Sequence, residues 1–141
     1  MTEVNQLTLS AELESLSAFR EFIKSTCTDL KGLDAQTLYD IQLAVDEVCT
    51  NIITHGYEGM DPGSIILRVE PEPGRVVVSI TDFGHPFEPV EPEAPNLEAT
   101  LEEREEGGLG LFFVFMSIDD ITYESSAVGN TTTLIKKYRG E

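Results

Sequence analysis

Tryptophan is absent from this chain of 141 residues, and cysteine and histidine occur only twice each. No Cys-x-x-Cys pair is present, and no pattern resembles a zinc site. Cys27 and Cys49 both lie inside apolar patterns of helical spacing. We therefore predict two buried thiols in preference to a disulfide or a metal site.

Basic residues are also scarce: Lys and Arg number 9 against 26 Asp and Glu, which gives a formal net charge of −17. A protein that binds a duplex needs clustered cations to neutralise phosphates, so this composition argues against direct binding of nucleic acid. The charge fits basic protein partners, although it would equally keep the protein soluble. Charge alone does not choose between the two.

Long apolar runs are missing as well. None approaches the roughly 20 residues that span a bilayer. The first residues, MTEVNQLTLSAELE, are acidic and lack the basic-then-apolar order of a signal peptide. We expect a cytoplasmic protein without a membrane segment, and the length suits one domain over residues 1–141.

Hydrophobic periodicity predicts helices alternating with β-hairpins. Asp34 is a suitable N-cap for a helix whose apolar residues recur every three or four positions, which predicts its buried side. Residues 84–107 are rich in proline and glutamate and predict a surface loop. The order of elements predicts an α+β fold: a two-layer sandwich in which three helices cover one face of a mixed, mostly antiparallel sheet. The predicted elements are strand 3–10, helices 15–30 and 34–56, strands 64–70 and 75–82, helix 108–115, and strands 118–125 and 131–138.

Three segments carry residues suited to chemistry. Glu47, Asn51 and His55 follow one another at spacings of four and form a polar row beside the apolar stripe, although a solvated face would look the same. Asp82 ends a predicted strand just before Phe83-Gly84. A carboxylate there can accept a hydrogen bond from an exocyclic amine, and glycine lets a flat ring come close. The same pattern is also an ordinary strand-to-turn signal.

Glycines at positions 107, 108 and 110 open the last predicted helix. Free backbone N–H groups at the positive end of a helix dipole form a ready site for phosphate. The segment is not a Walker P-loop, because no Gly-Lys-Ser/Thr follows. It is not the Rossmann fingerprint either, because Phe113 stands where the last glycine belongs. The alternative interpretation is a flexible hinge.

In combination, these segments match a family. EVCTNIITHGYEG, TDFGHPFEP, EGGLGLFFVFMSIDDITY and GNTTTLIKK resemble the bacterial anti-sigma factor serine/threonine kinases, members of the histidine-kinase-like ATPase superfamily with the Bergerat fold. The resemblance covers nearly the whole chain. It implies an ATP pocket built from residues 46–57, 81–89 and 106–113, with residues 84–107 as a lid.

The resemblance also implies roles for single residues. Glu47 would act as general base, and Asn51 would hold a Mg²⁺ that bridges the ATP phosphates. His55 would lie near the phosphates without a catalytic role. Asp82 would bind the amino group of adenine, and Gly84 would give access to the ring. The other nucleotide-binding residues would be Phe87, Arg104 (otherwise a solvated charge), Gly108, Leu109, Gly110 and Leu111 near the phosphates, and Thr131, whose hydroxyl would support Asp82.

The activity implied by the resemblance is ATP-dependent phosphorylation of a serine on an anti-anti-sigma protein of the STAS type. The same protein, a homodimer, would sequester a sigma factor. A second hypothesis is a partner switch that binds nucleotide weakly or not at all. The glutamates of the lid favour it, because carboxylates close to a triphosphate cost energy. We set aside a histidine-kinase catalytic module, since no separate segment carries an acceptor histidine, and gyrase-type or Hsp90-type activity, which needs further domains.

Overall fold

The computed structural model describes residues 5–86 and 108–138. Within these residues five strands form one sheet in the order β1-β2-β3-β5-β4. Every neighbouring pair of these strands is antiparallel, so the sheet is antiparallel rather than mixed. The strands are β1 (Asn5–Ser10), β2 (Ser64–Glu72), β3 (Arg75–Asp82), β4 (Asp120–Ser126) and β5 (Gly129–Lys137).

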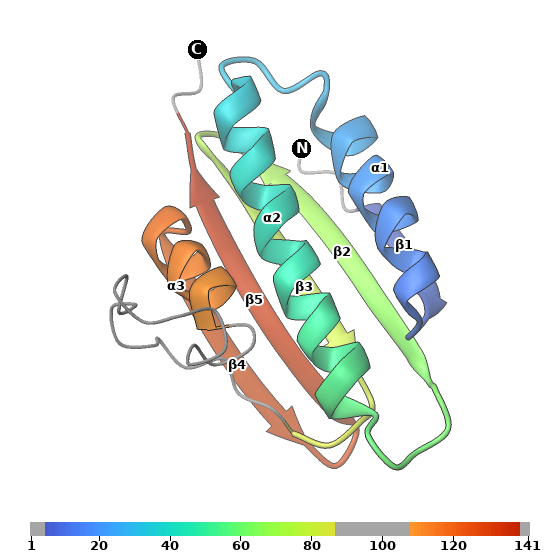
Figure 1. The fold of residues 1–141 in the computed structure, drawn as a ribbon. Coiled ribbons are helices and arrows are strands. Elements are labelled where there is room, and N and C mark those ends of the chain that lie inside the picture. The colour runs from blue at the N-terminus through green and yellow to red at the C-terminus, as the bar shows by residue number, and fades with distance from the viewer. Residues whose placement is uncertain (1–4, 87–107, 139–141) are drawn as a thin grey trace.

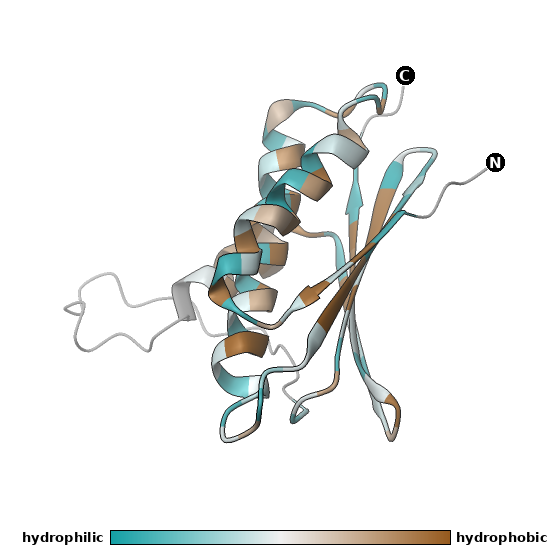
Figure 2. Ribbon diagram, turned by 90° about the vertical axis from the view of Figure 1, so that its right-hand side faces the viewer, coloured by the Kyte–Doolittle hydropathy of each residue, from teal (hydrophilic) through white to brown (hydrophobic). Residues whose placement is uncertain are grey.

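The helices α1 (Leu16–Cys27), α2 (Ala35–Asn51) and α3 (Gly108–Ser117) all lie on the same face of this sheet. Seen edge-on in Figure 2, the helices form one layer and the strands the other. In Figure 1, α2 runs across the middle of the sheet, with α1 on the β1 side and α3 on the β4 side. The predicted α+β sandwich with three helices on one face is confirmed.

The core lies between the two layers and follows the predicted periodicities. In β3, alternate residues from Val76 to Asp82 are buried. In α2, the predicted stripe is buried at Ile41, Val45 and Val48 and continues beyond the helix at Ile52. The Asp34 carboxylate accepts a hydrogen bond of 2.8 Å from the backbone N–H of Thr37, so the predicted N-cap is confirmed.

Helix ends differ most from the prediction in the first two helices. Helix α1 ends at Cys27, and the chain turns there because Leu30 N donates to Cys27 O. The α-helical part of the second helix ends at Asn51 and continues as a π-helical turn, Ile52–Gly56. Tyr57 N donates to Ile52 O over 3.1 Å, the i to i+5 bond that defines such a turn.

The two cysteines are buried and free, as predicted. Burial raises the pKa of the Cys27 thiol to about 11 and raises the pKa of the Cys49 thiol further. Among the described residues, no helix combines the length and apolar character needed to cross a membrane.

Candidate functional site

Asp82 ends β3 on the sheet face that the helices cover, and only 4% of its surface is exposed. Its Oδ1 accepts two hydrogen bonds of 3.0 Å, from Gly84 N and from Asn130 Nδ2. A buried carboxylate is costly unless polar groups satisfy it, and these two donors do so. Among the described residues, both of these donors bond to Oδ1, so we consider Oδ2 the oxygen that could accept a further hydrogen bond.

The turn after Asp82 is held against the end of the second helix. His85 N donates to Gly56 O over 2.6 Å, and Phe83 N donates to the Tyr57 hydroxyl over 2.9 Å. A Cβ on Gly84 would lie 2.3 Å from the carbonyl oxygen of Gly56. Gly84 is therefore required for this backbone contact, whatever it contributes to ring access.

The structure does not bring Thr131 to Asp82. Successive residues of a strand point to opposite faces. Asp82 pairs with Asn130 in the β3–β5 register, so Thr131 faces the side away from the helices. There its hydroxyl lies 3.0 Å from that of Thr81. Asn130, which the sequence analysis missed, occupies the supporting position that we had assigned to Thr131.

Glu47 is half-buried on α2, and burial, with a smaller contribution from Asp46, raises the pKa of its carboxyl. The first turn of α3 lies against it, because a Cβ on Gly110 would be 2.5 Å from Glu47 Cδ. A larger residue at position 110 would displace either the carboxylate or the helix. The predicted glycine-rich helix start and the predicted base are thus neighbours in space.

Asn51 and His55 lie in different kinds of helix. Asn51 is the last residue of α2, one turn beyond Glu47 on the same row. His55 lies in the π-helical turn, where the wider turn does not continue an α-helical spacing of four. The predicted row of three is therefore regular for Glu47 and Asn51 only, and the side chain of His55 is exposed.

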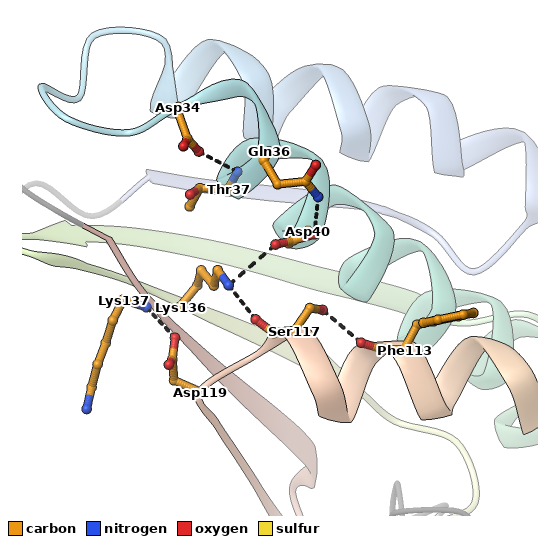
Figure 3. Close-up of polar contacts among 9 residues, drawn as sticks. All are labelled: Asp34, Gln36, Thr37, Asp40, Phe113, Ser117, Asp119, Lys136 and Lys137. Carbon is orange, nitrogen blue, oxygen red and sulfur yellow. Dashed lines mark hydrogen bonds and ion pairs between the residues drawn. The ribbon is translucent and has the colours of Figure 1, made fainter. Parts of the chain in front are cut away.

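Polar contacts of Lys136 hold the C-terminal end of α3 in place, as Figure 3 shows. Lys136 of β5 donates through Nζ to the carbonyl oxygen of Ser117, the last residue of α3. The same Nζ lies 3.4 Å from Asp40 Oδ2 on α2, with only 17% and 15% of the two side chains exposed. Lys136 thereby ties α3 to α2, the helix that carries Glu47.

Part of the predicted site lies outside the described residues. Phe87, Arg104 and most of the predicted lid, 84–107, belong to this part. Gly108 begins α3, and Leu111, in the first turn, is partly buried. For Leu109 only the helical backbone position is described.

Comparison with known proteins agrees with this arrangement. Residues 9–136 match the family model of the histidine kinase-like ATPase domain. The serine-protein kinase RsbW of Bacillus velezensis is 26% identical over 142 residues, which cover 96% of this chain and 86% of that protein. An anti-sigma F factor of Clostridium botulinum is 33% identical over 98 residues, 70% of this chain and 68% of its own. The names of these relatives, a serine-protein kinase and an anti-sigma factor, agree with the family resemblance that the sequence motifs indicated.

Solved structures support the fold. The RsbU and RsbW domains of Rv1364c from Mycobacterium tuberculosis match with a TM-score of 0.69 at 20% identity, covering 96% of this chain and 32% of that longer one. A histidine kinase domain from Erythrobacter litoralis matches with a TM-score of 0.54 at 15% identity, covering 92% of this chain and 62% of that one. The fold, the motifs and the matched family model together show that this chain belongs to the histidine kinase-like ATPase domain family.

Proposed function

We propose that this chain is an ATP-dependent protein-serine kinase and anti-sigma factor. It would sequester a sigma factor and would phosphorylate a serine of a STAS-type anti-anti-sigma protein. The observation that carries the kinase part is the contact between Gly110, at the start of α3, and Glu47. This contact sets a carboxylate with a raised pKa beside a helix N-terminus suited to phosphate. The names of the relatives support the regulatory part.

Adenine recognition is assigned to Asp82. Its Oδ2 would accept a hydrogen bond from the amino group of adenine, while the donors on Oδ1 keep the carboxylate in place. The backbone N–H groups at the start of α3, from Gly108 to Leu111, would bind the phosphates, because no intrahelical acceptor uses them. Phe87 and Arg104 remain assigned to the nucleotide by resemblance.

The donor set around Asn51 fits Mg²⁺. This ion usually binds one or two protein oxygens and completes its shell with water and nucleotide phosphates. Among the described residues no group of three or more His, Cys, Asp and Glu side chains forms a metal cage, and Mg²⁺ with a nucleotide does not need one. The amide oxygen of Asn51 would hold the ion. When bound, Mg²⁺ would neutralise charge on the phosphates.

Glu47 would act on the acceptor serine. Its carboxylate would take the proton of the serine hydroxyl as Oγ bonds to the γ-phosphorus and the bond from that phosphorus to the β–γ bridging oxygen breaks. The products are phosphoserine and ADP. The raised pKa of Glu47 suits this task, because a base works best when its pKa lies nearer the working pH.

The oligomeric state, the cellular location and the extent of the domain are inferred from the resemblance to the kinase family. We propose a cytoplasmic homodimer in which residues 1–141 form one ATPase domain, with residues 84–107 as its lid. Light scattering of the purified protein tests the dimer, because a single-chain mass would contradict it.

The test of the proposed function is transfer of labelled phosphate from Mg·ATP to a STAS-domain protein, with a serine-to-alanine acceptor as the negative control. Glu47→Gln should abolish transfer while ATP binding persists. Glu21→Gln, the same change at an exposed carboxylate of α1, should retain transfer. Wild-type protein that binds ATP without transfer would favour the non-catalytic partner switch. Wild-type protein that is folded and binds no ATP would contradict the nucleotide site itself.

A further inference from the structure

We propose that Asn130 is a specificity-determining residue: it fixes Asp82 as a hydrogen-bond acceptor and so selects purine nucleotides with an amino group at position 6. This inference rests on the proposed role of Asp82 in binding the base. Asn130 lies in the segment GNTTTLIKK, but the resemblance assigned a role there to Thr131 and none to Asn130.

A row of three polar residues crosses neighbouring strands on the helix-covered face. In the sheet register Asp82 of β3 pairs with Asn130 of β5, and Asn130 pairs with Ser125 of β4. Asn130 is 3% exposed. The Ser125 hydroxyl donates to Asn130 Oδ1 over 2.7 Å, and Asn130 Nδ2 donates to Asp82 Oδ1 over 3.0 Å. The backbone register therefore sets the order of donors and acceptors along the row.

The orientation of the Asn130 amide follows from its partners. Nδ2 also donates to the carbonyl oxygen of Gly84 over 3.0 Å. Both of its hydrogens thus face acceptors, a carboxylate and a carbonyl, that an amide oxygen could not approach favourably. With the Ser125 hydroxyl on the amide oxygen, all three contacts agree on one orientation. Asn130 consequently presents a donor, and not an acceptor, to Asp82.

The hydrogen bond from Asn130 determines how Asp82 can hydrogen-bond to a ligand. An ionised carboxylate only accepts hydrogen bonds, and the donors on Oδ1 hold it in one orientation. The position 6 of adenine carries an amino donor and matches it. Hypoxanthine carries an oxo group there, and its lone pairs would face the carboxylate. Without the Asn130 donor, only the N–H of Gly84 still bonds to Oδ1. The carboxylate is then held less firmly for the amino group of adenine, so discrimination between the two bases should fall.

The experiment measures dissociation constants for Mg·ATP and Mg·ITP by isothermal titration, and the readout is the ratio of the two. The wild-type protein should prefer ATP. Asn130→Leu removes the donor at similar volume and should lower the preference roughly tenfold or more, the value of a hydrogen bond to a charged group. Ser125→Ala, which frees the amide to rotate, should lower it less. Ser126→Ala is the matched control: it lies next to Ser125, is exposed, and bonds only to the β4–β5 turn, so the ratio should not change.

The outcomes separate this inference from the proposed function. An unchanged ATP-to-ITP ratio in Asn130→Leu and Ser125→Ala, with a wild-type protein that prefers ATP, would overturn the inference alone. A wild-type protein that binds the two nucleotides equally, or binds neither, would overturn the role of Asp82 as well. If Asn130→Leu does not fold, the ATP-to-ITP ratios of Asn130→Ala and Ser125→Ala test the inference in its place. A merely structural role would weaken both nucleotides equally and leave the ratio as it was.

Discussion

Replacing Gly84 by alanine probes the contact between the turn after β3 and the end of the second helix. The added Cβ would lie 2.3 Å from Gly56 O and 2.7 Å from Gly56 C. Both are backbone atoms and cannot rotate away as the end of a side chain can. Ordinary contact begins at 3.4 Å, so the turn must retreat by about 1 Å.

The cost follows from the hydrogen bonds that this retreat disturbs. The bond from His85 N to Gly56 O, at 2.6 Å, breaks, and the bond from Phe83 N to the Tyr57 hydroxyl, at 2.9 Å, lengthens. Each contributes about 1 kcal/mol to the free energy of unfolding, and overpacking costs about 1–3 kcal/mol. We expect a loss of about 2–5 kcal/mol, which lowers Tm by roughly 6–20 °C in a domain of this size.

Thermal unfolding followed by circular dichroism measures this loss, and Gly56→Ala is the matched control. Gly56 lies on the other side of the same contact, but the nearest atoms to its added Cβ are 3.6, 3.8 and 3.9 Å away. That variant should stay within about 1 kcal/mol of the wild type. An unchanged Tm for Gly84→Ala would refute the reasoning, because it would mean that the two backbones are not in contact.

Three further changes test other parts of the structure. Burial raises the pKa of Glu47 in the folded protein above its ordinary value of 4.5. The contribution of Glu47 to stability is therefore fully present below its ordinary pKa of 4.5 and is lost as the pH rises through the raised pKa. Glu47→Gln should therefore match the wild-type Tm at about pH 4 and exceed it at about pH 7. Lys136→Met leaves the largely buried Asp40 without its ion-pair partner and should lower the free energy of unfolding in urea by about 1–3 kcal/mol. Asp40→Leu in the same chain should restore part of this loss. Because burial raises both thiol pKa values, a thiol reagent at neutral pH should leave Cys27 and Cys49 unmodified in the native protein, and mass spectrometry should find both modified in urea.

The sequence predicts the parts of this structure that depend on neighbours along the chain. The Asp34 cap and the buried stripe of α2 are set by residues within a few turns, and both were predicted correctly. Gly84 was also identified, but its main constraint, the backbone of Gly56, comes from a distant segment. Sequence spacing gives no sign of that contact.

Asn130 shows where such prediction fails. Its partner Asp82 is brought to it by the β3–β5 register, a pairing between segments far apart in the sequence. The resemblance implied this role for Thr131, yet a shift of one residue along a strand changes the face on which a side chain lies. Counting back by twos from the buried Leu134 would have placed position 130, and not 131, on the inner face.

The π-helical turn at Ile52–Gly56 has a consequence for length variation among homologous chains. A π turn holds one residue more than an α turn, and each residue of an α-helix rotates the chain by about 100°. Deleting one residue here would let α2 continue as an α-helix and would swing Gly56 away from Gly84. Insertions and deletions should therefore be accepted in the exposed loop from Glu58 to Pro62 and rejected within the turn. Alignment gaps placed inside Ile52–Gly56 would then mark chains that have lost the contact with the turn after Asp82.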